Sequence, residues 1–317
     1  MASPPANLNC ILLNACGAAY NIGPATCTYV ADQIYAPNVP YQEPPRTACG
    51  GSNLINAATV GQCPFGIVVA FRGTLPPSDS DPDSLLDWLQ DFFAEPTTCT
   101  SGPNRVPGQV HSGFFEAITS IIEPIQSLVA GYQPSPGNPV YVTGHSAGGA
   151  LASLGAYILS QNLGVPVASP VVTFASPKPG NINFAGGFLK VLGQTRFEND
   201  RDIVPLLPPS TAFIDLAVAI LQLIPLVGSE LSRLFRSAES WDYLPVGTMQ
   251  FITSAFEVIS NESVEAQTWD VAKEFGEDVW TENFSSFVAA HSLAPGLGYN
   301  SGACGSGPDP GNLHRSS

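Results

Sequence analysis

Positively charged side chains are scarce in this sequence. Its 317 residues include 11 Lys and Arg against 26 Asp and Glu, which gives a formal net charge of −15, and charged residues make up only 12%. An acidic surface of this kind argues against partners that are nucleic acids and against an electrostatic hold on anionic membranes. Any contact with a membrane would therefore have to be apolar.

Metal-binding patterns, repeats and long apolar runs are also missing. The chain has four histidines and seven cysteines, and no two cysteines form a CxxC pair, so we expect no metal site. No internal repeat is visible. The most apolar stretch, residues 212–227, is interrupted by Asp215, Gln222 and Pro225. It is too short and too interrupted to cross a bilayer, so no transmembrane segment is predicted.

The cysteines bear on cellular location. Many cysteines in a chain of low charge favour an oxidising compartment, so we expect a secreted protein with disulfides. Residues 1–9 have no basic stretch, and the apolar run 10–13 is too short for a secretion signal. A mature secreted form and a protein that is not exported both remain open. Cys49 and Cys63 flank a predicted strand and could form a local bond, and Cys27 with Cys304 could tie the ends together.

Hydrophobic residues make up 44% of the sequence, enough for a large core, and we expect one domain over residues 1–317. Buried strands alternate with helices, which predicts an α/β fold with a mostly parallel sheet and helices on both faces. Strands are expected at 54–60, 66–71, 139–145, 171–175, 195–199 and 249–253. Helices are expected at 8–20, 85–93, 112–132, 147–162, 183–192 and 264–279. Residues 29–61 otherwise resemble a loop, and the tail 305–317 is rich in Gly, Ser and Pro.

Two details of these elements can be tested. Ser112 is the expected cap of the helix 112–132, and Pro124 in its middle should kink or divide it. A helical insert at about 210–240 carries the apolar stretch described above. The insert can either pack into the core or form a cap that faces lipid, and the sequence leaves both open.

The sequence Gly144-His145-Ser146-Ala147-Gly148 follows a β-branched run and precedes an Ala/Leu-rich helix. Strand, Gly-x-Ser-x-Gly turn and helix together are the signature of a nucleophile elbow, in which the serine has a strained backbone and its flanks must be small. A chance Gly/Ser turn is the plain alternative, and the flanking elements argue against it. We therefore predict Ser146 as a nucleophile.

A serine hydroxyl needs a histidine to take its proton and an acid to orient that histidine. On an α/β-hydrolase scaffold the acid and the histidine follow the serine in that order. His111 precedes Ser146, His145 adjoins it and points away from its hydroxyl, and His314 lies in the tail. These exclusions leave His291 as the predicted base.

The acid should stand where a strand ends. Asp202 follows the predicted strand 195–199 and has the best claim. Asp200 and Glu198 are its rivals, and we expect them to be solvated or paired with Arg201.

Six stretches occur along the chain in a diagnostic order. They are Phe71-Arg72-Gly73-Thr74, Asp87-Trp88-Leu89-Gln90-Asp91, Val110-His111-Ser112-Gly113-Phe114, Gly144-His145-Ser146-Ala147-Gly148-Gly149-Ala150, residues 199–205 and His291. Together they resemble the class 3 lipases, a family of filamentous-fungus-type triacylglycerol lipases and related feruloyl esterases. The resemblance covers residues 65–205 well and is weaker around residues 243–252 and at His291.

The resemblance implies roles for further residues. Thr74, through its N–H and hydroxyl, and Ala147, through its N–H, would form the oxyanion hole. A lid at about 75–95 would place Leu85, Trp88, Leu89 and Phe92 over the substrate. Three departures from the family pattern are visible: a long proline-rich lead-in at 75–84, alanine rather than leucine at 147, and the insert that separates Asp202 from His291.

These observations predict a serine hydrolase of carboxylic esters that needs no cofactor, with an acylglycerol lipase as the first choice. A soluble-ester or feruloyl esterase and a phospholipase A1 are alternatives within the enzyme class. A catalytically inactive lipid-binding relative is the alternative outside it. We expect a monomer that contacts the lipid–water interface transiently through its lid.

Overall fold

The computed structural model describes residues 4–74, 88–221, 228–260, 271, 273, 277 and 284–305. Its main sheet has eight strands, and the five from β3 to β11 in spatial order are parallel, whereas the outer pairs are antiparallel. The strands are, in spatial order, β1 (Arg46–Gly50), β2 (Asn56–Cys63), β3 (Gly66–Phe71), β6 (Val140–His145), β7 (Val171–Phe174), β9 (Gln194–Asn199), β11 (Thr248–Ile252) and β12 (Val258–Ser260). A mostly parallel sheet is thus confirmed.

A second, antiparallel sheet has the order β10 (Tyr243–Leu244), β8 (Gly180–Asn181), β5 (Gln109–His111) and β4 (Pro96–Thr98). The helices are α1 (Leu8–Tyr20), α3 (Ser112–Gly131), α4 (Ala147–Tyr157), α5 (Ile182–Leu189), α6 (Thr211–Leu221), α7 (Gly228–Ser237), α9 (Phe284–His291) and α10 (Gly298–Cys304). Short helical turns lie at Ser52–Leu54, Ile158–Asn162 and Val204–Leu206. None of the helices in these described ranges is long and apolar enough to cross a bilayer.

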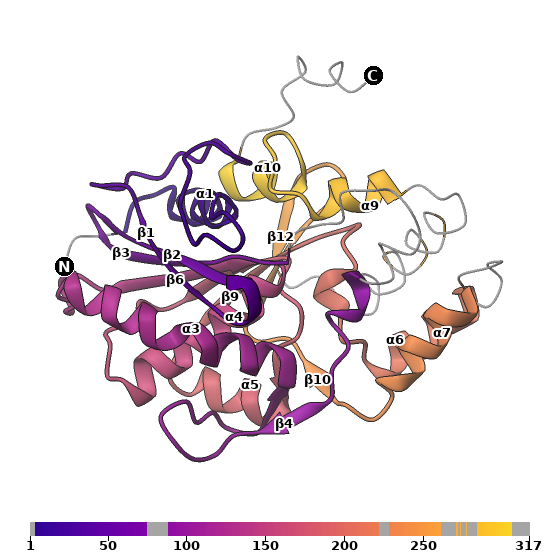
Figure 1. The fold of residues 1–317 in the computed structure, drawn as a ribbon. Helices are drawn as coiled ribbons and strands as arrows, with labels where there is room; N and C mark the ends of the chain where they lie inside the picture. The colour runs from indigo at the N-terminus through magenta and orange to yellow at the C-terminus, as the bar shows by residue number, and fades with distance from the viewer. Residues whose placement is uncertain are drawn as a thin grey trace.

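Helices cover both faces of the main sheet, as predicted. α3 and α4 lie on one face, and α1 and α10 lie on the other (Figure 1). Side chains that alternate along a strand enter opposite layers: Val69 and Phe71 pack with the α3/α4 layer, whereas Val68 and Ala70 pack with α1. Strand β3 is therefore buried on both faces, which explains its continuous apolar sequence.

The predicted helix 8–20 and strand 66–71 coincide with α1 and β3. One prediction about α3 is wrong, and one of two alternatives for it is excluded. The cap is His111, whose ring accepts a hydrogen bond from the Phe114 N–H, and not Ser112. Pro124 lies inside α3 without dividing it. The predicted loop 29–61 also contains β1, which pairs with β2 along its whole length.

Both predicted disulfide pairings are wrong as well. Cys10 pairs with Cys304, which joins the start of α1 to the end of α10, and Cys27 pairs with Cys49. Cys63 is a buried free thiol. A bond that ties the two ends together does exist, but it begins at Cys10.

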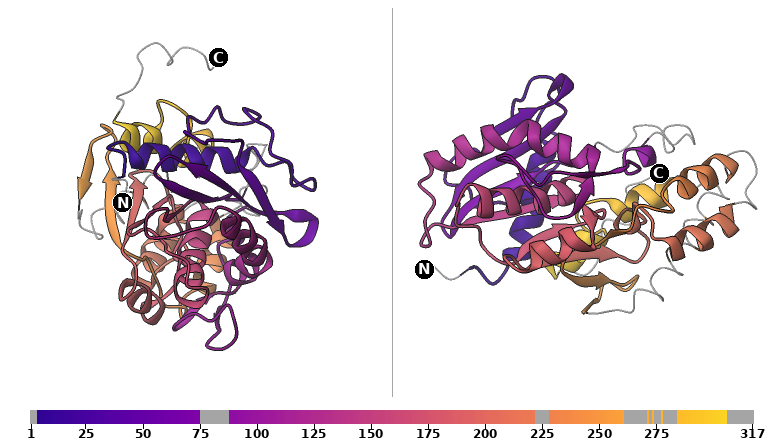
Figure 2. Two further views of the ribbon diagram at one scale, coloured as in Figure 1. Left: turned by 90° about the vertical axis from the view of Figure 1, so that its left-hand side faces the viewer. Right: turned by 90° about the horizontal axis from the view of Figure 1, so that it is seen from below.

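The insert after Asp202 forms two helices, α6 and α7, which lie side by side at one end of the molecule (Figures 1 and 2). Phe213, Ile214 and Ala217 of α6 are buried in the same apolar cluster as Phe235 of α7. Phe93 packs beside them, with its ring tilted against that of Phe235 and the centroids 5.4 Å apart. These contacts support the core-packing interpretation of α6. Residues 222–227, most of the predicted helix 264–279 and the tail from 306 onward lie outside the described residues.

Candidate active site

Ser146 stands at the junction of β6 and α4 with φ 59° and ψ −138°, a backbone conformation that non-glycine residues rarely adopt. The turn leaves no room for side chains on its flanks. A Cβ at Gly144 would collide with the Gly148 carbonyl, and one at Gly148 would collide with the Phe71 carbonyl. The two glycines are thus required by close backbone approach, and the strained residue between them is the one predicted as nucleophile.

Asp202 and His291 are in direct contact although 89 positions separate them in the sequence. The distance from His291 Nδ1 to Asp202 Oδ2 is 2.8 Å, and both side chains are buried. The Tyr299 hydroxyl donates to the same carboxylate oxygen at 2.6 Å, and the Val204 N–H donates to the other oxygen at 3.0 Å. Burial, and then the neighbouring Asp202, raise the pKa of Tyr299 well above its ordinary value, so its hydroxyl remains a donor.

The other nitrogen of His291 is available. His291 Nε2 and Ser146 Oγ are both buried, and neither has a hydrogen-bond partner among the described residues. The ring of His145, the residue next to Ser146, lies 4.6 Å from the ring of His291, centroid to centroid. The fold therefore brings the elbow and the histidine–aspartate pair into one place.

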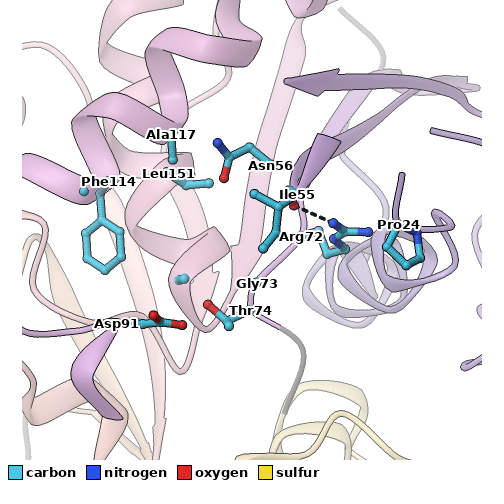
Figure 3. Close-up of a pocket in the computed structure, with 12 residues that line it drawn as sticks. Pro24, Ile55, Asn56, Arg72, Gly73, Thr74, Asp91, Phe114, Ala117 and Leu151 are labelled. Carbon is cyan, nitrogen blue, oxygen red and sulfur yellow. Dashed lines mark hydrogen bonds between the residues drawn. The ribbon is translucent and has the colours of Figure 1, made fainter. Parts of the chain in front are cut away.

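The residues predicted for the oxyanion hole line one cavity. Thr74 and Ala147 share a cavity of 440 Å³ with Asp91, Phe114 and Leu151 (Figure 3). The chain just before Thr74 passes directly beside the nucleophile, because a Cβ at Gly73 would lie 2.7 Å from the Ser146 Cβ. The cavity walls are mainly apolar, which suits an acyl chain.

Three of the four predicted lid residues are described. Residues 88–90 are helical, Trp88, Leu89 and Phe92 are buried, and Leu85 lies outside the described residues. The ring of Trp88 meets that of His291 edge to face, with centroids 5.4 Å apart. Trp88 therefore covers the histidine side of the site.

The histidines set aside in the sequence have other partners. His111 caps α3, and burial lowers its pKa to about 4. His145 is buried and hydrogen-bonded at both nitrogens, to the Tyr20 hydroxyl and to the His291 carbonyl. His314 lies outside the described residues.

Glu198, a rival for the acid, pairs with Arg196 at 2.5 Å rather than with Arg201. The carboxylate that bonds His291 is that of Asp202. Sequence reasoning missed two tyrosines of the site, Tyr20 and Tyr299. No local pattern marks either of them, because each reaches its partner only through the tertiary fold.

The geometry can be set beside known proteins. Residues 68–212 match the family described as Lipase (class 3). Over these residues the chain is similar to the class 3 lipases. It is 33% identical over 148 residues to the secreted mono- and diacylglycerol lipase 1 of Fusarium solani, an alignment that covers 45% of this chain and 39% of that protein. It is 29% identical over 205 residues to phospholipase A1-II 6 of Oryza sativa subsp. japonica, with 52% and 47% covered.

The alignments thus span less than half of the length of these curated relatives. Among solved structures, the triacylglyceride lipase of Rhizomucor miehei superposes on this chain with a TM-score of 0.53 at 21% identity, over 80% of this chain and 82% of that one. Another fungal lipase structure gives a TM-score of 0.58 at 17% identity, over 93% and 97%. These likenesses show that the chain shares its fold, a mostly parallel sheet flanked by helices, with fungal lipase structures.

Proposed function

We propose that this protein is a serine hydrolase that cleaves carboxylic esters through an acyl-enzyme. The observation that carries the proposal is the buried Asp202–His291 pair beside the strained elbow of Ser146. A serine, a histidine and an oriented acid form the constellation that activates a hydroxyl for acyl transfer. Its three members stand in the chain order of α/β-hydrolases.

In the proposed reaction, Ser146 Oγ attacks the ester carbonyl while His291 Nε2 accepts its proton. Asp202 holds the Nδ1–H of His291 and stabilises the imidazolium that forms. The N–H groups of Thr74 and Ala147, with the Thr74 hydroxyl, meet the developing oxyanion. His291 then protonates the departing alcohol. In the second half of the reaction His291 takes a proton from water, which attacks the acyl-enzyme, and returns that proton to Ser146 Oγ as the acid is released.

The proposed substrate is an acylglycerol. The apolar cavity beside Thr74 and Ala147 suits an acyl chain, and the Fusarium solani and Rhizomucor miehei relatives are named as lipases. Phospholipase A1 is a second candidate, because the Oryza sativa relatives carry that name at similar identity. Both substrates present an ester of a long acyl chain, and they differ in the group that leaves.

The wider setting belongs to the same proposal. We propose a single domain over residues 1–317 that acts as a monomer and is secreted, as the name of the Fusarium solani relative says of that protein. The segment with Trp88, Leu89 and Phe92 would act as a lid that moves from His291 to let substrate enter at a lipid surface. The pair α6 and α7 packs behind this segment and would support it.

The test compares the wild type with Ser146→Ala. A serine-directed phosphonate should label the wild type at Ser146 and leave the variant unlabelled. p-Nitrophenyl esters from acetate to palmitate, a triacylglycerol emulsion and phosphatidylcholine vesicles then define the substrate. We expect the long-chain esters and the emulsion to be hydrolysed by the wild type, and activity to fall to background in the variant at unchanged circular dichroism.

Each other outcome has a definite meaning. Faster hydrolysis of the vesicles would make the protein a phospholipase A1, and a preference for acetyl or cinnamoyl esters would make it an esterase. A folded wild type that neither labels nor hydrolyses any ester would be an inactive lipid-binding relative. Substantial turnover by Ser146→Ala would remove Ser146 as the nucleophile.

A further inference from the structure

The proposed reaction assigns no role to His145, a buried histidine of the site. His145 is the last residue of β6, directly before Ser146, and has partners at both ring nitrogens. The Tyr20 hydroxyl lies 2.8 Å from Nδ1, and the main-chain carbonyl oxygen of His291 lies 2.8 Å from Nε2. The partner on one side is therefore the backbone of the residue that is the proposed base.

These two bonds determine the protonation of the ring. A carbonyl oxygen only accepts, so Nε2 must carry the proton that it donates to His291. Burial lowers the pKa of His145 well below its ordinary value, so the ring is neutral and its Nδ1 is an acceptor. The hydrogen bond with Tyr20 then has one direction, with the hydroxyl donating. Tyr20 thus holds His145 in the tautomer that can bind the His291 carbonyl.

The bond from His145 completes the support of residue 291. His291 is the last residue of α9, and its carbonyl has no later turn of that helix to accept from. Its side chain is fixed through Nδ1 by Asp202, and its main chain is fixed by His145. Two attachment points on opposite sides of one residue leave Nε2 with little freedom of direction.

Tyr20 connects the same support to the oxyanion side. It ends α1, and it lies so close to Gly73 that a Cβ on that glycine would collide with its hydroxyl. One buried hydroxyl therefore touches the segment before Thr74 and the ring that holds His291. This contact therefore links the segment before Thr74 to the ring that bonds the His291 carbonyl.

We propose that His145 is a positioning residue for His291, held in its donor tautomer by Tyr20. This inference rests on the proposed function. Neither residue lines the cavity beside Thr74 and Ala147, so substrate binding should not depend on them. Loss of the contact should reduce the rate of the chemical step, because a misplacement of about 1 Å can cost about 100-fold in rate.

The experiment uses three variants of the full chain. His145→Phe removes both hydrogen bonds, and Tyr20→Phe removes only the hydroxyl that fixes the tautomer. His145→Gln keeps an N–H donor that can reach the His291 carbonyl. Tyr41→Phe is the matched control, since Tyr41 is a partly buried tyrosine packed against the same cluster as Tyr20, and its buried hydroxyl bonds none of the site residues.

The readouts are kcat and KM for one soluble ester, the rate of phosphonate labelling at Ser146, and the thermal midpoint. For His145→Phe and Tyr20→Phe we expect kcat and the labelling rate to fall by about 10- to 100-fold with KM unchanged. His145→Gln should recover most of the loss, and Tyr41→Phe should match the wild type in kcat. If His145→Phe does not fold, Tyr20→Phe and His145→Gln decide the matter.

Wild-type kcat and labelling in Tyr20→Phe, or a lower thermal midpoint without any loss of rate, would overturn the positioning role. Equal losses in His145→Gln and His145→Phe would also overturn it, because the donor would then not matter. If the wild type is not labelled at Ser146, the proposed function is wrong, and the inference that rests on it is wrong as well. If the wild type is labelled and the variants are labelled equally fast, only the positioning role is contradicted.

Discussion

Asp202 shows how a single buried carboxylate can be held in place on several sides. It accepts from His291, from the Tyr299 hydroxyl and from the Val204 N–H, and its side chain is fully enclosed. A buried carboxylate is costly unless its oxygens are satisfied, and these three donors satisfy it. Asp200, two positions earlier, is only partly buried, and its main chain bonds Ile252 of β11.

The first prediction separates these two acids. Asp202→Asn should lower kcat by about 10⁴-fold, because an amide neither holds the Nδ1–H tautomer of His291 nor stabilises the imidazolium. Asp200→Asn should retain near wild-type kcat. The measurement is hydrolysis of a soluble ester by both variants, with thermal midpoints to confirm folding. A severe loss in Asp200→Asn with an active Asp202→Asn would give the acid's role to Asp200.

At this scale the sequence is informative where chemistry is local. Ser146 can be predicted because its strain imposes glycines within two positions. His291 and Asp202 follow from chain order. Tyr299 and Tyr20 cannot be predicted in this way, because their partners stand 97 and 125 positions away and a lone tyrosine is compatible with any core.

Among the elements, α3 illustrates how a tertiary contact overrides a capping rule. Serine is a preferred cap, yet the cap here is the ring of His111, which accepts from the Phe114 N–H at 3.2 Å and stacks on the Phe114 ring at 3.9 Å. The buried position of β5 brings this ring to the helix start. Because the cap is a buried imidazole with a pKa lowered to about 4, the stability that it gives to α3 depends on pH.

The second prediction follows from that coupling. The folded pKa of His111 lies below its value in the unfolded chain, so the unfolded state takes up the proton first as pH falls. The free energy of unfolding should therefore decline between about pH 6.5 and pH 4 and should have no further contribution from His111 below that range.

His111→Asn retains a side chain that can cap α3 and removes the titration. We expect a shallower decline of the free energy of unfolding with pH, measured by urea denaturation at pH 7, 5.5 and 4. Part of the slope should remain, because burial also lowers the pKa of His145. Parallel curves for wild type and variant would show that His111 takes no part in the acid response.

Whether an element can be predicted depends on how fully it is buried. Strands β3 and β6 are buried along their whole length; β3 is a continuous apolar run, and β6 begins with Val140, Tyr141 and Val142 before it turns polar at Thr143. Strands β4 and β12 are partly or wholly exposed at sheet edges, and their sequences lack a pattern that distinguishes them from loops. Their pairing depends on neighbouring strands, so only the fold reveals them.

At the scale of the whole molecule, the two ends of the described chain meet. The Cys10–Cys304 disulfide joins α1 to α10 across 294 positions. These helices carry Tyr20 and Tyr299, the two tyrosines that bond His145 and Asp202. The Cys10–Cys304 disulfide therefore joins the two helices that carry these tyrosines, although the disulfide itself is not part of the proposed site. The second disulfide, Cys27–Cys49, closes only 22 positions.

The third prediction compares the two cross-links. In the chain-entropy description, a bond that closes a long loop restricts the unfolded state more, by about 2 kcal/mol for these two loop lengths. Cys10→Ser/Cys304→Ser should therefore lower the free energy of unfolding more than Cys27→Ser/Cys49→Ser, as measured by urea denaturation at neutral pH. The Cys10→Ser/Cys304→Ser variant should also lose ester hydrolysis at a lower temperature than the wild type, because without the disulfide α1 and α10 can separate and take Tyr20 and Tyr299 with them. If the short-loop variant proved the less stable, or if the long-loop variant kept its activity up to the wild-type melting temperature, the clamp between α1 and α10 would be irrelevant to the site.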